Sequence, residues 1–475
     1  MRKTKIVCTI GPASRDEKTL RELIKSGMNV ARLNFSHGSH DYHKETIDML
    51  KKVRSEMEVP LAIMLDTKGP EIRIKDFENG KAELSDGGLF TLYADDRPGN
   101  NGGVSITYPE LSESLSVGDT VLINDGSIVL KVEKTDGNNI ICRIITGGVL
   151  TNKKGINVPG VTIDMPYLSE RDKADIRFGI ENDVDFIAAS FVRSAQDVIS
   201  LRKFKDYYGG HDIRVISKIE NMQGIDNFDE ILENSDGIMV ARGDMGVEVD
   251  FERLPGLQKR FINRCYKSGK MAICATQMLE SMINNHTPTR AEITDVANAV
   301  FDGTSAVMLS GETAMGKYPV LTVKVMAKIA EQAESDAFEM DYYKGIKYDM
   351  DTDTTNAMCD AACTTAKDIN AAAIIALTKC GHTARRMSKF RPYVPIVAAT
   401  PVEKTFHQLS LSWGVYPVIA RYQSDTESLF LHAIDCAKQI DLVKDGDIAV
   451  IAAGVPLDTP GNTNLLKVAV VGNKY

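Results

Sequence analysis

The chain has 475 residues, too many for one hydrophobic core, and at about 150 residues per domain we expect about three domains. Its net charge is −9 and no block of like charge stands out, which argues against nucleic acid or a membrane surface as a partner. No apolar run approaches the ~20 residues of a membrane span, and the eight cysteines are scattered without a C-x-x-C pair. These features indicate a cytoplasmic protein with reduced thiols.

Short apolar runs of strand length recur along the chain, and amphipathic helical patterns separate them. Near-continuous apolar strands that alternate with helices are typical of a parallel sheet covered by helices. Eight such units predict a closed (β/α)8 TIM barrel. The eight runs are K-I-V-C-T-I-G (5–11), N-V-A-R-L-N-F (29–35), L-A-I-M-L-D-T (61–67), D-F-I-A-A-S-F (185–191), R-V-I-S-K-I-E (214–220), G-I-M-V-A-R-G-D (237–244), M-A-I-C-A-T-Q (271–277) and A-V-M-L-S-G-E (306–312).

Residues 70–166 interrupt this rhythm between the third and fourth strands. They contain D-G-G, N-N-G-G and N-D-G turn signals, and the alternating patterns between these predict a small, mostly β domain. The insertion follows a strand, so it emerges on the C-terminal face of the barrel, where it can act as a lid. Short strands are predicted at 82–84, 89–93, 120–123, 128–133 and 140–144.

A third unit begins after an acidic connector, D-Y-Y-K-G-I-K-Y-D-M-D-T-D, near residue 340. Helical patterns alternate there with apolar runs such as A-A-I-I-A-L-T and I-A-V-I-A-A, which predicts a C-terminal α/β domain. The expected domains are therefore the barrel at 1–69 and 167–338, the inserted domain at 70–166 and the C-terminal domain at 339–475.

Polar side chains gather at the C-terminal ends of the predicted barrel strands, where barrels of this class place catalytic groups. Lys218 and Glu220 are two residues apart and therefore point to the same face. Alone, this pair fits either half of a divalent-metal site beside an ammonium group or a structural ion pair. The set as a whole favours an active site. It comprises Arg32, Asn34, Ser36, His37, Asp66, Thr67, Lys68, Glu71, Arg73, Lys218, Glu220, Asp244, Thr276, Gln277, Ser310 and Glu312.

The residue types at these strand ends indicate the chemistry. Glu220 and Asp244, with few other carboxylates nearby, suit Mg²⁺, which takes one or two protein carboxylates and completes its coordination with substrate oxygen and water. Arg32, Arg73 and Lys218 repel one another in an empty site and so imply an anionic ligand, a phosphate or a carboxylate. A second, all-oxygen cluster suits a monovalent cation, with a loop-bracing hydrogen-bond network as the alternative. It consists of Asn34, Ser36, Asp66 and Thr67.

The segment G-E-T-A-M-G-K-Y (311–318) comes close to a P-loop and lies between a predicted strand and a helix. Tyr318, however, occupies the position of the Ser or Thr that binds magnesium, and Pro319 is typical of a helix start. We therefore do not assign a nucleotide phosphate site to this segment.

These motifs together resemble the pyruvate kinase family, in the family's own order and across the whole barrel. The resemblance implies phosphoryl transfer from phosphoenolpyruvate to ADP, giving pyruvate and ATP, with Mg²⁺ or Mn²⁺ and K⁺ as cofactors. It also implies a homotetramer. The motifs are C-T-I-G-P, G-M-N-V-A-R-L-N-F-S-H-G, M-L-D-T-K-G-P-E-I-R, K-K-G-I-N-V-P-G, I-S-K-I-E-N, I-M-V-A-R-G-D-M-G-V-E, C-A-T-Q-M-L-E-S-M and M-L-S-G-E-T-A-M-G-K-Y-P.

The resemblance also implies roles for single residues. Arg32 and Lys218 contact the transferring phosphoryl group, and Lys218 stabilises its transition state. Gly243, Asp244 and Thr276 hold the substrate carboxylate, and Thr276 is the candidate for delivering the proton to the enolate. Glu220 and Asp244 then hold Mg²⁺. The K⁺ ligands are Asn34, Ser36, Asp66 and Thr67, and the nucleotide side has Asn34, His37, Arg73 and Lys154.

Two further expectations come from the family pattern. Relatives with Lys at the position of Glu71 replace the monovalent ion by that ammonium group, so Glu71 implies a K⁺ requirement. The C-terminal domain resembles the family's regulatory domain, and T-K-C-G-H-T (378–383) with the loop at 454–464 is expected to bind a sugar-phosphate or nucleotide effector. The 378–383 segment contains Cys380 and His382, and the 454–464 loop lacks the Trp and Arg of some fructose-bisphosphate-activated members. Ordinary turns are the alternative for both segments. The candidate effector residues are Thr378, Lys379, Gly381, His382 and Thr383.

Two other functions compete with this interpretation. A metal-dependent barrel lyase or aldolase acting on pyruvate-like acids also uses a Glu and an Asp around Mg²⁺, but it has no need of a lid with Arg73 and Lys154. An inactive metabolite sensor would have lost one of the four strand-end groups, and all four are present. These groups are Arg32, Lys218, Glu220 and Asp244.

Overall fold

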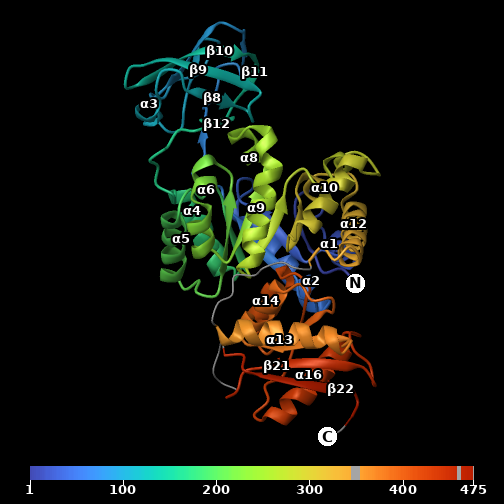
Figure 1. The fold of residues 1–475 in the computed structure, drawn as a ribbon. Coiled ribbons are helices and arrows are strands. Elements are labelled where there is room, and N and C mark those ends of the chain that lie inside the picture. Colours follow the sequence, from blue (N-terminus) through green and yellow to red (C-terminus); the bar gives the residue numbers. More distant parts are fainter. Residues whose placement is uncertain (344–352, 457–461, 474–475) are drawn as a thin grey trace.

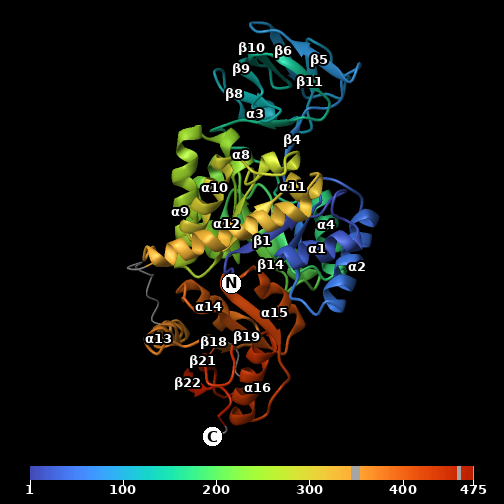
Figure 2. The same ribbon diagram turned by 90° about the vertical axis from the view of Figure 1, so that its right-hand side faces the viewer.

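The structure is a computed structural model that describes residues 1–343, 353–456 and 462–473. Three bodies follow one another along the long axis of the molecule: the inserted β domain, the barrel and the C-terminal α/β domain (Figure 1). A view turned by 90° shows the same order, with α12 (Pro319–Glu339) crossing the outside of the barrel (Figure 2). The inserted domain and the C-terminal domain therefore meet opposite ends of the barrel.

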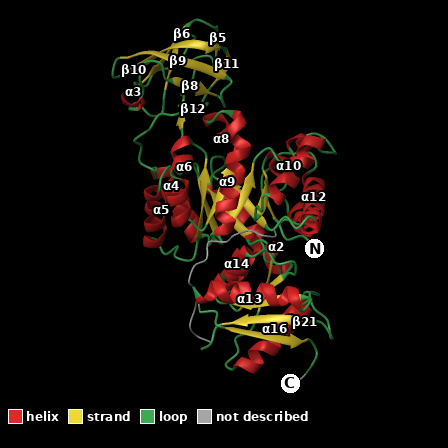
Figure 3. Cartoon of the chain, in the orientation of Figure 1, coloured by secondary structure: helices red, strands yellow, loops and turns green. Residues whose placement is uncertain are grey.

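Eight parallel strands close the barrel in the order β1-β17-β16-β15-β14-β13-β3-β2, which confirms the predicted TIM barrel. Their side chains are almost all buried, because apolar residues fill the interior and helices cover the outside (Figure 3). The strands are β1 (Lys5–Thr9), β2 (Val30–Asn34), β3 (Ala62–Asp66), β13 (Phe186–Ala189), β14 (Arg214–Ile219), β15 (Gly237–Ala241), β16 (Met271–Ala275) and β17 (Ala306–Leu309).

Side-chain caps mark several starts of the covering helices. Asp16 accepts a hydrogen bond from the amide of Thr19, and Ser169 and Thr289 each open a reciprocal capping box. These caps satisfy amides that the first helical turn leaves unpaired. The other helices of the barrel are α1 (Glu17–Ser26), α2 (His40–Glu56), α4 (Glu170–Glu181), α5 (Ala195–Tyr207), α6 (Met222–Asp226), α7 (Phe228–Asn234), α8 (Arg242–Glu248), α9 (Leu254–Lys267), α10 (Arg290–Phe301) and α11 (Gly311–Ala314).

The sixth strand is shorter than predicted. The expected run 237–244 ends as a strand at Ala241, and the following residues form α8, so Asp244 lies in the first turn of a helix. The chain turns there because Ala241 leaves the extended conformation, with φ −89° and ψ 80°, and the Gly243 amide donates to Thr276 Oγ1 at 2.8 Å. The prediction that a strand reaches Asp244 was wrong, but Asp244 still lies at the mouth of the barrel.

The inserted domain has its own sheet and its own apolar core. All five predicted strands occur, as β5 (Lys81–Leu84), β6 (Leu89–Tyr93), β8 (Thr120–Ile123), β9 (Ile128–Thr135) and β10 (Asn139–Thr146). The largest sheet has the order β4-β12-β8-β9-β10-β6-β7, and β11 pairs with β5. The elements that the sequence pattern did not indicate are β4 (Ile72–Arg73), β7 (Gly103–Ser105), α3 (Leu111–Ser114), β11 (Gly148–Thr151) and β12 (Gly155–Asn157).

The C-terminal domain is a five-stranded sheet in the order β20-β19-β18-β21-β22, and only β22 is antiparallel. Two predicted segments lie partly outside the described residues: the acidic connector at 344–352, and the 454–464 loop at 457–461. The elements are α13 (Thr354–Asp368), β18 (Ala373–Leu377), α14 (His382–Lys389), β19 (Ile396–Thr400), α15 (Glu403–Gln408), β20 (Val415–Ile419), α16 (Thr426–Gln439), β21 (Ile448–Ala453) and β22 (Leu465–Val470).

The C-terminal domain packs against the end of the barrel where the strands begin. Lys5 Nζ, at the start of β1, donates to the carbonyl oxygen of Val415 at 2.6 Å. Trp413 is 1% exposed at this junction, with the Arg391 guanidinium 4.4 Å from its ring centre and Phe338 of α12 packed beside it. Within the described parts of the chain, no helix is both long and apolar enough to cross a membrane.

Candidate active site

Lys218 lies at the end of β14 and projects into the mouth of the barrel, where groups from other strands surround it. Its Nζ is 3.0 Å from Glu220 Oε1, 3.1 Å from Asp66 Oδ1 and 2.7 Å from Ser190 Oγ. Asp66 also accepts a hydrogen bond from Arg32 Nε at 2.6 Å through its other oxygen. The structure thus brings four predicted residues and one unpredicted serine into a single buried group, which we call the Lys218 cluster.

Mutual attraction keeps Lys218 and Asp66 charged. Burial opposes a charged amine, but Asp66 and Glu220 outweigh it and hold the pKa of Lys218 above its usual range. Burial likewise opposes a charged Asp66, and Arg32 with Lys218 outweighs it, so that the pKa of Asp66 is lowered. Lys218 is therefore a permanent cation, suited to stabilising negative charge and unsuited to exchanging a proton.

Glu220 differs from Lys218 and Asp66, because the effect of burial on its carboxylate outweighs the attraction of its cationic neighbour. Burial raises the pKa of Glu220 to about 8, the Asp244 carboxylate adds to this rise, and Lys218 opposes it. The Phe191 amide donates to Glu220 Oε2 at 2.5 Å. A divalent cation between Glu220 and Asp244 would relieve their repulsion. Among the described residues no group of three or more His, Cys, Asp and Glu side chains is placed to hold a metal. Mg²⁺ takes one or two protein carboxylates, and Glu220 and Asp244 are the candidates for them.

The predicted monovalent-cation residues lie at the ends of the adjacent strands β2 and β3. Asn34 and Asp66 are register partners in this pair. Asn34 Oδ1 accepts from the amide of Ser36 at 3.1 Å, and Thr67 Oγ1 accepts from the amide of Ser190 at 3.1 Å. The four residues are therefore neighbours, and part of their hydrogen-bonding capacity already braces the loops.

Thr276 faces the start of α8 from the neighbouring strand. Its Oγ1 accepts from the Gly243 amide at 2.8 Å and lies 2.7 Å from the carbonyl oxygen of Ala275, to which its hydroxyl donates. Thr276 has φ 67°, in the left-handed region. Arg242 holds this turn, because Nη2 donates to the Thr276 carbonyl at 2.6 Å and Nη1 pairs with Asp295 at 2.7 Å. Two of the predicted carboxylate-binding residues, Gly243 and Thr276, thus contact each other where the start of α8 meets the end of β16.

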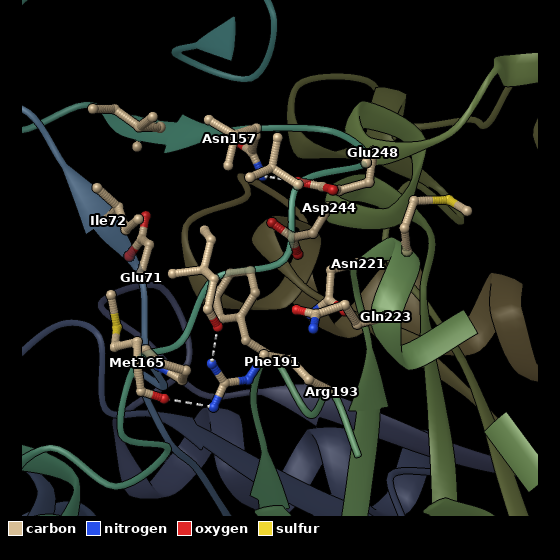
Figure 4. A pocket seen from close by; sticks show the side chains of 18 of the residues that line it. Glu71, Ile72, Asn157, Met165, Phe191, Arg193, Asn221, Gln223, Asp244 and Glu248 are labelled. Atoms are coloured by element: carbon tan, nitrogen blue, oxygen red, sulfur yellow. Dashed lines mark hydrogen bonds between the residues drawn. The ribbon is translucent and has the colours of Figure 1, made fainter. Parts of the chain in front are cut away.

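A cavity of about 350 Å³ separates the inserted domain from the barrel mouth (Figure 4). Arg73, Lys154 and Asp244 line it, while Arg32, Lys218 and Glu220 lie deeper and are absent from its lining. Arg73 pairs with Glu71 at 2.7 Å and donates to the Lys153 carbonyl at 2.7 Å. His37, expected on the nucleotide side, is exposed beyond β2 and does not line this cavity.

The loop after β13 carries functional groups that the sequence reasoning missed. Ser190 belongs to the Lys218 cluster, and Phe191 binds Glu220 through its amide. Arg193 pairs with Asp197 and donates to the carbonyl oxygens of Ile163 at 3.1 Å and Met165 at 2.8 Å, in the segment that returns from the inserted domain (Figure 4). The polar end of the predicted fourth strand, in D-F-I-A-A-S-F, was the signal that could have identified Ser190.

A second cavity, of about 100 Å³, lies in the C-terminal domain at the predicted effector segment. Thr378, Lys379, His382 and Thr383 line it, whereas Gly381 does not. Gly381 instead makes the turn into α14, with φ 77° and its amide bonded to Thr378 Oγ1 at 3.0 Å. Described residues of the 454–464 loop also line this cavity. Its lining there includes Gly454, Asn462 and Thr463.

Comparison with known proteins gives one consistent result. The family model "Pyruvate kinase, barrel domain" matches residues 1–323, and "Pyruvate kinase, alpha/beta domain" matches residues 356–469. A pyruvate kinase of Clostridium acetobutylicum is 46% identical over 99% of this chain and 100% of its own length. One of Staphylococcus aureus is 48% identical over 100% of this chain and 81% of its own length. The crystal structure of a pyruvate kinase from Cryptosporidium parvum superposes with a TM-score of 0.92 at 38% identity, over 99% of this chain and 96% of that one.

Proposed function

The chain belongs to the pyruvate kinase family, and we propose that the Lys218 cluster and the cavity beside it form its active site. It is a phosphotransferase that moves the phosphoryl group of phosphoenolpyruvate to ADP and yields pyruvate and ATP. The observation that carries the site assignment is the sharing of Asp66 by Lys218 and Arg32, at 3.1 Å and 2.6 Å. Two cations fixed on one buried carboxylate form a preorganised receptor for a phosphoryl group.

The reaction breaks the bond between phosphorus and the enol oxygen and forms a bond from phosphorus to an ADP β-phosphate oxygen. Such transfers need positioning and charge neutralisation more than covalent help from the protein. Lys218 and Arg32 supply the fixed positive charge on the transferring group, and Lys218 keeps its proton throughout because its pKa is raised. Arg73 and Lys154, which line the cavity from the inserted domain, bind the nucleotide phosphates.

Members of the family need a divalent metal ion, and they need K⁺ as well unless a Lys at the position of Glu71 replaces it. We assign the divalent ion to Glu220 and Asp244, and K⁺ to Asn34, Ser36, Asp66 and Thr67. The divalent ion, when bound, neutralises phosphate and carboxylate charge between the two substrates. Asn34 and His37 complete the proposed nucleotide side.

After phosphoryl transfer the enolate must take up a proton on carbon. Thr276 is the proposed donor of this proton. We also assign it, with Gly243 and Asp244, to holding the substrate carboxylate. Its hydroxyl donates to the Ala275 carbonyl at 2.7 Å, so it must turn away from this acceptor to face a substrate. A threonine hydroxyl is a weak acid by itself, so we propose that Thr276 delivers the proton through a water relay.

The C-terminal cavity is the proposed effector site for a sugar phosphate or a nucleotide. Its phosphate-binding groups are the Thr378 and Thr383 hydroxyls, the Lys379 ammonium and the His382 imidazole, with Gly381 shaping the turn. The homotetramer is the assembly we propose. All eight cysteines are free thiols, which supports the proposed cytoplasmic location.

Pyruvate formation from phosphoenolpyruvate, with and without ADP, tests the proposed site and the main rival function together. Wild-type protein should form pyruvate only with ADP and a divalent ion. The Arg73→Ala and Lys154→Ala variants should have a KM for ADP raised by about tenfold or more, as expected when a charge-assisted contact is lost. Pyruvate release that does not depend on ADP would instead favour a lyase.

A further inference from the structure

A hydrogen bond between two side chains that line the cavity joins the inserted domain to the barrel. Asn157 Nδ2 donates to Glu248 Oε1 at 2.9 Å, between residues 91 positions apart in the chain (Figure 4). Asn157 is the last residue of β12 and Glu248 is the last residue of α8. Both side chains line the cavity and neither is fully exposed. This bond therefore fastens the inserted domain to the helix that carries Asp244.

The inserted domain reaches α8 with the same edge that carries its cations. Lys154 directly precedes β12, and Arg73 on β4 is the register partner of Gly155. On its other side, β12 pairs with β8. The turn that follows β8 approaches α8, where a Cβ atom placed on Gly126 would lie 3.8 Å from Val247 Cγ1. A fixed β12 therefore fixes both cations of the nucleotide side.

Helix α8 depends on outside contacts because it is short. It has seven residues and no side-chain cap at its N-terminus. Its first turn is held by Arg242 and by the bond from the Gly243 amide to Thr276 Oγ1, whereas Glu248 at its far end is held by Asn157. The Asn157–Glu248 bond thus joins the element that presents Asp244 to the element that presents Lys154.

We propose that Asn157 and Glu248 are positioning residues that latch the inserted domain over the active site and so set the affinity for ADP. This inference deepens the proposed function, because it takes Arg73 and Lys154 as the nucleotide-binding cations. The proposed phosphoenolpyruvate contacts do not depend on the latch. Arg32 and Lys218 belong to barrel strands, and the first turn of α8, with Gly243 and Asp244, is held by Arg242 and Thr276. Loss of the hydrogen bond should therefore raise the KM for ADP and leave the KM for phosphoenolpyruvate nearly unchanged.

The test uses the full chain and the variants N157A, N157D, E248Q and N157D/E248Q. N157A removes the donor, and N157D places a carboxylate against the Glu248 carboxylate. E248Q keeps an amide oxygen that accepts from Asn157. The double variant restores a hydrogen bond with exchanged roles, because the amide of Gln can donate to the new carboxylate. N139A is the matched control, since Asn139 makes a similar amide–carboxylate bond to Asp136 at 3.2 Å in the β9–β10 turn.

Two measurements apply to each variant: the KM values for both substrates, and amide hydrogen exchange across 154–157 without ligands. We expect N157A to raise the KM for ADP about tenfold, the scale of one lost hydrogen bond to a charged group, and to speed exchange in β12. N157D should be at least as impaired. In N157D/E248Q the KM for ADP and the exchange rate in β12 should return to within about threefold of the wild-type values. In E248Q and N139A both should stay within the same range.

An N157A variant with unchanged KM for ADP and unchanged exchange would overturn the latch. A double variant no better than N157D would overturn it as well, because a merely structural asparagine would not be rescued by the exchange of roles. Failure of the proposed function has a different signature. Arg73→Ala and Lys154→Ala would then leave the KM for ADP unchanged, while N157A would still speed exchange in β12.

Discussion

Ser190 Oγ lies 2.7 Å from Lys218 Nζ and is therefore the nearest hydrogen-bond partner of that cation in the Lys218 cluster. The Ser190 hydroxyl has one proton to donate and two possible acceptors. The carbonyl oxygen of Thr67 lies 2.7 Å from Oγ and is the nearer one, because Asp66 Oδ1 lies 3.1 Å away. Ser190 thus connects the proposed K⁺ ligand Thr67 to Lys218. The ammonium is held by a neutral acceptor as well as by the carboxylates Asp66 and Glu220.

Ser190→Ala should lower kcat about 10- to 100-fold, since a hydrogen bond to a charged group contributes about 1.5–3 kcal/mol. Steady-state kinetics at saturating substrates and K⁺ measure this effect. Ser217→Ala is the matched control. Ser217 lies on β14 and is buried as Ser190 is, but its Oγ bonds to Ser235 Oγ at 2.6 Å, outside the Lys218 cluster. Equal kcat losses in the two variants would contradict a specific role for Ser190.

Lys218→Met should lower kcat by roughly 10²–10³ or more, the scale of one lost transition-state donor. Binding of a divalent ion should persist, because Glu220 and Asp244 remain and the competing cation is gone. Turnover and direct Mn²⁺ binding measure the two effects separately. Lys203→Met, an exposed change on α5, serves as the control. Near-normal turnover of Lys218→Met would remove Lys218 from the catalytic set.

Glu71→Lys should weaken the K⁺ requirement, because it brings an ammonium group toward the proposed monovalent site. It also removes the carboxylate that Arg73 contacts at 2.7 Å, so a higher KM for ADP should accompany the change. A K⁺ titration in a background of a large organic cation measures the requirement. Glu78→Lys makes the same charge change at an exposed site of the inserted domain and should leave the K⁺ curve as it is in wild type. An unchanged curve for Glu71→Lys would refute the prediction.

His407 should make the protein less stable as the pH falls from about 6.5 toward 4. Burial lowers the pKa of His407 to about 4, with Arg54 adding to this effect and Glu403 opposing it. The unfolded chain, with an ordinary histidine pKa of about 6.5, binds a proton in this window that the folded chain does not, so stability rises with pH across it. Above about pH 6.5 both states are neutral at His407 and its effect disappears.

Melting temperatures at pH 7.0 and 5.5 test this linkage. His407→Gln should lose less of its melting temperature between the two values than wild type does. His211→Gln is the control, because the His211 side chain is 72% exposed. Parallel losses in His407→Gln and wild type would show that other groups cause the acid sensitivity.

The sequence predicted what regular spacing encodes. Period-two spacing placed Lys218 and Glu220 on one face, and eight repeated strand–helix units predicted the barrel. Strands such as β4 and β12 were missed because two or three residues are too few to show alternation. The helix at Asp244 was missed because the turn at Ala241 depends on Thr276 and Arg242, which are contacts between neighbouring strands.

The site was predictable in its residue types and less so in its connections. Ser190 ends a strand just as Asp66 and Glu220 do, so the same rule could have included it. Asn157 and Glu248 are different. Each lies in a motif noted from the sequence, but no spacing pattern in one sequence indicates that two residues 91 positions apart form a hydrogen bond. Such contacts depend on how the inserted domain sits on the barrel, which is a matter of tertiary packing.

The chain contains a single tryptophan, and its position makes it an intrinsic optical reporter. Trp413 is buried at the junction of the barrel with the C-terminal domain, between Arg391 and the end of α12. The inserted domain lies at the far end of the barrel, so its movement does not touch the indole (Figure 1). Emission from this one ring therefore follows the seating of the C-terminal domain without any label, separately from events at the catalytic end.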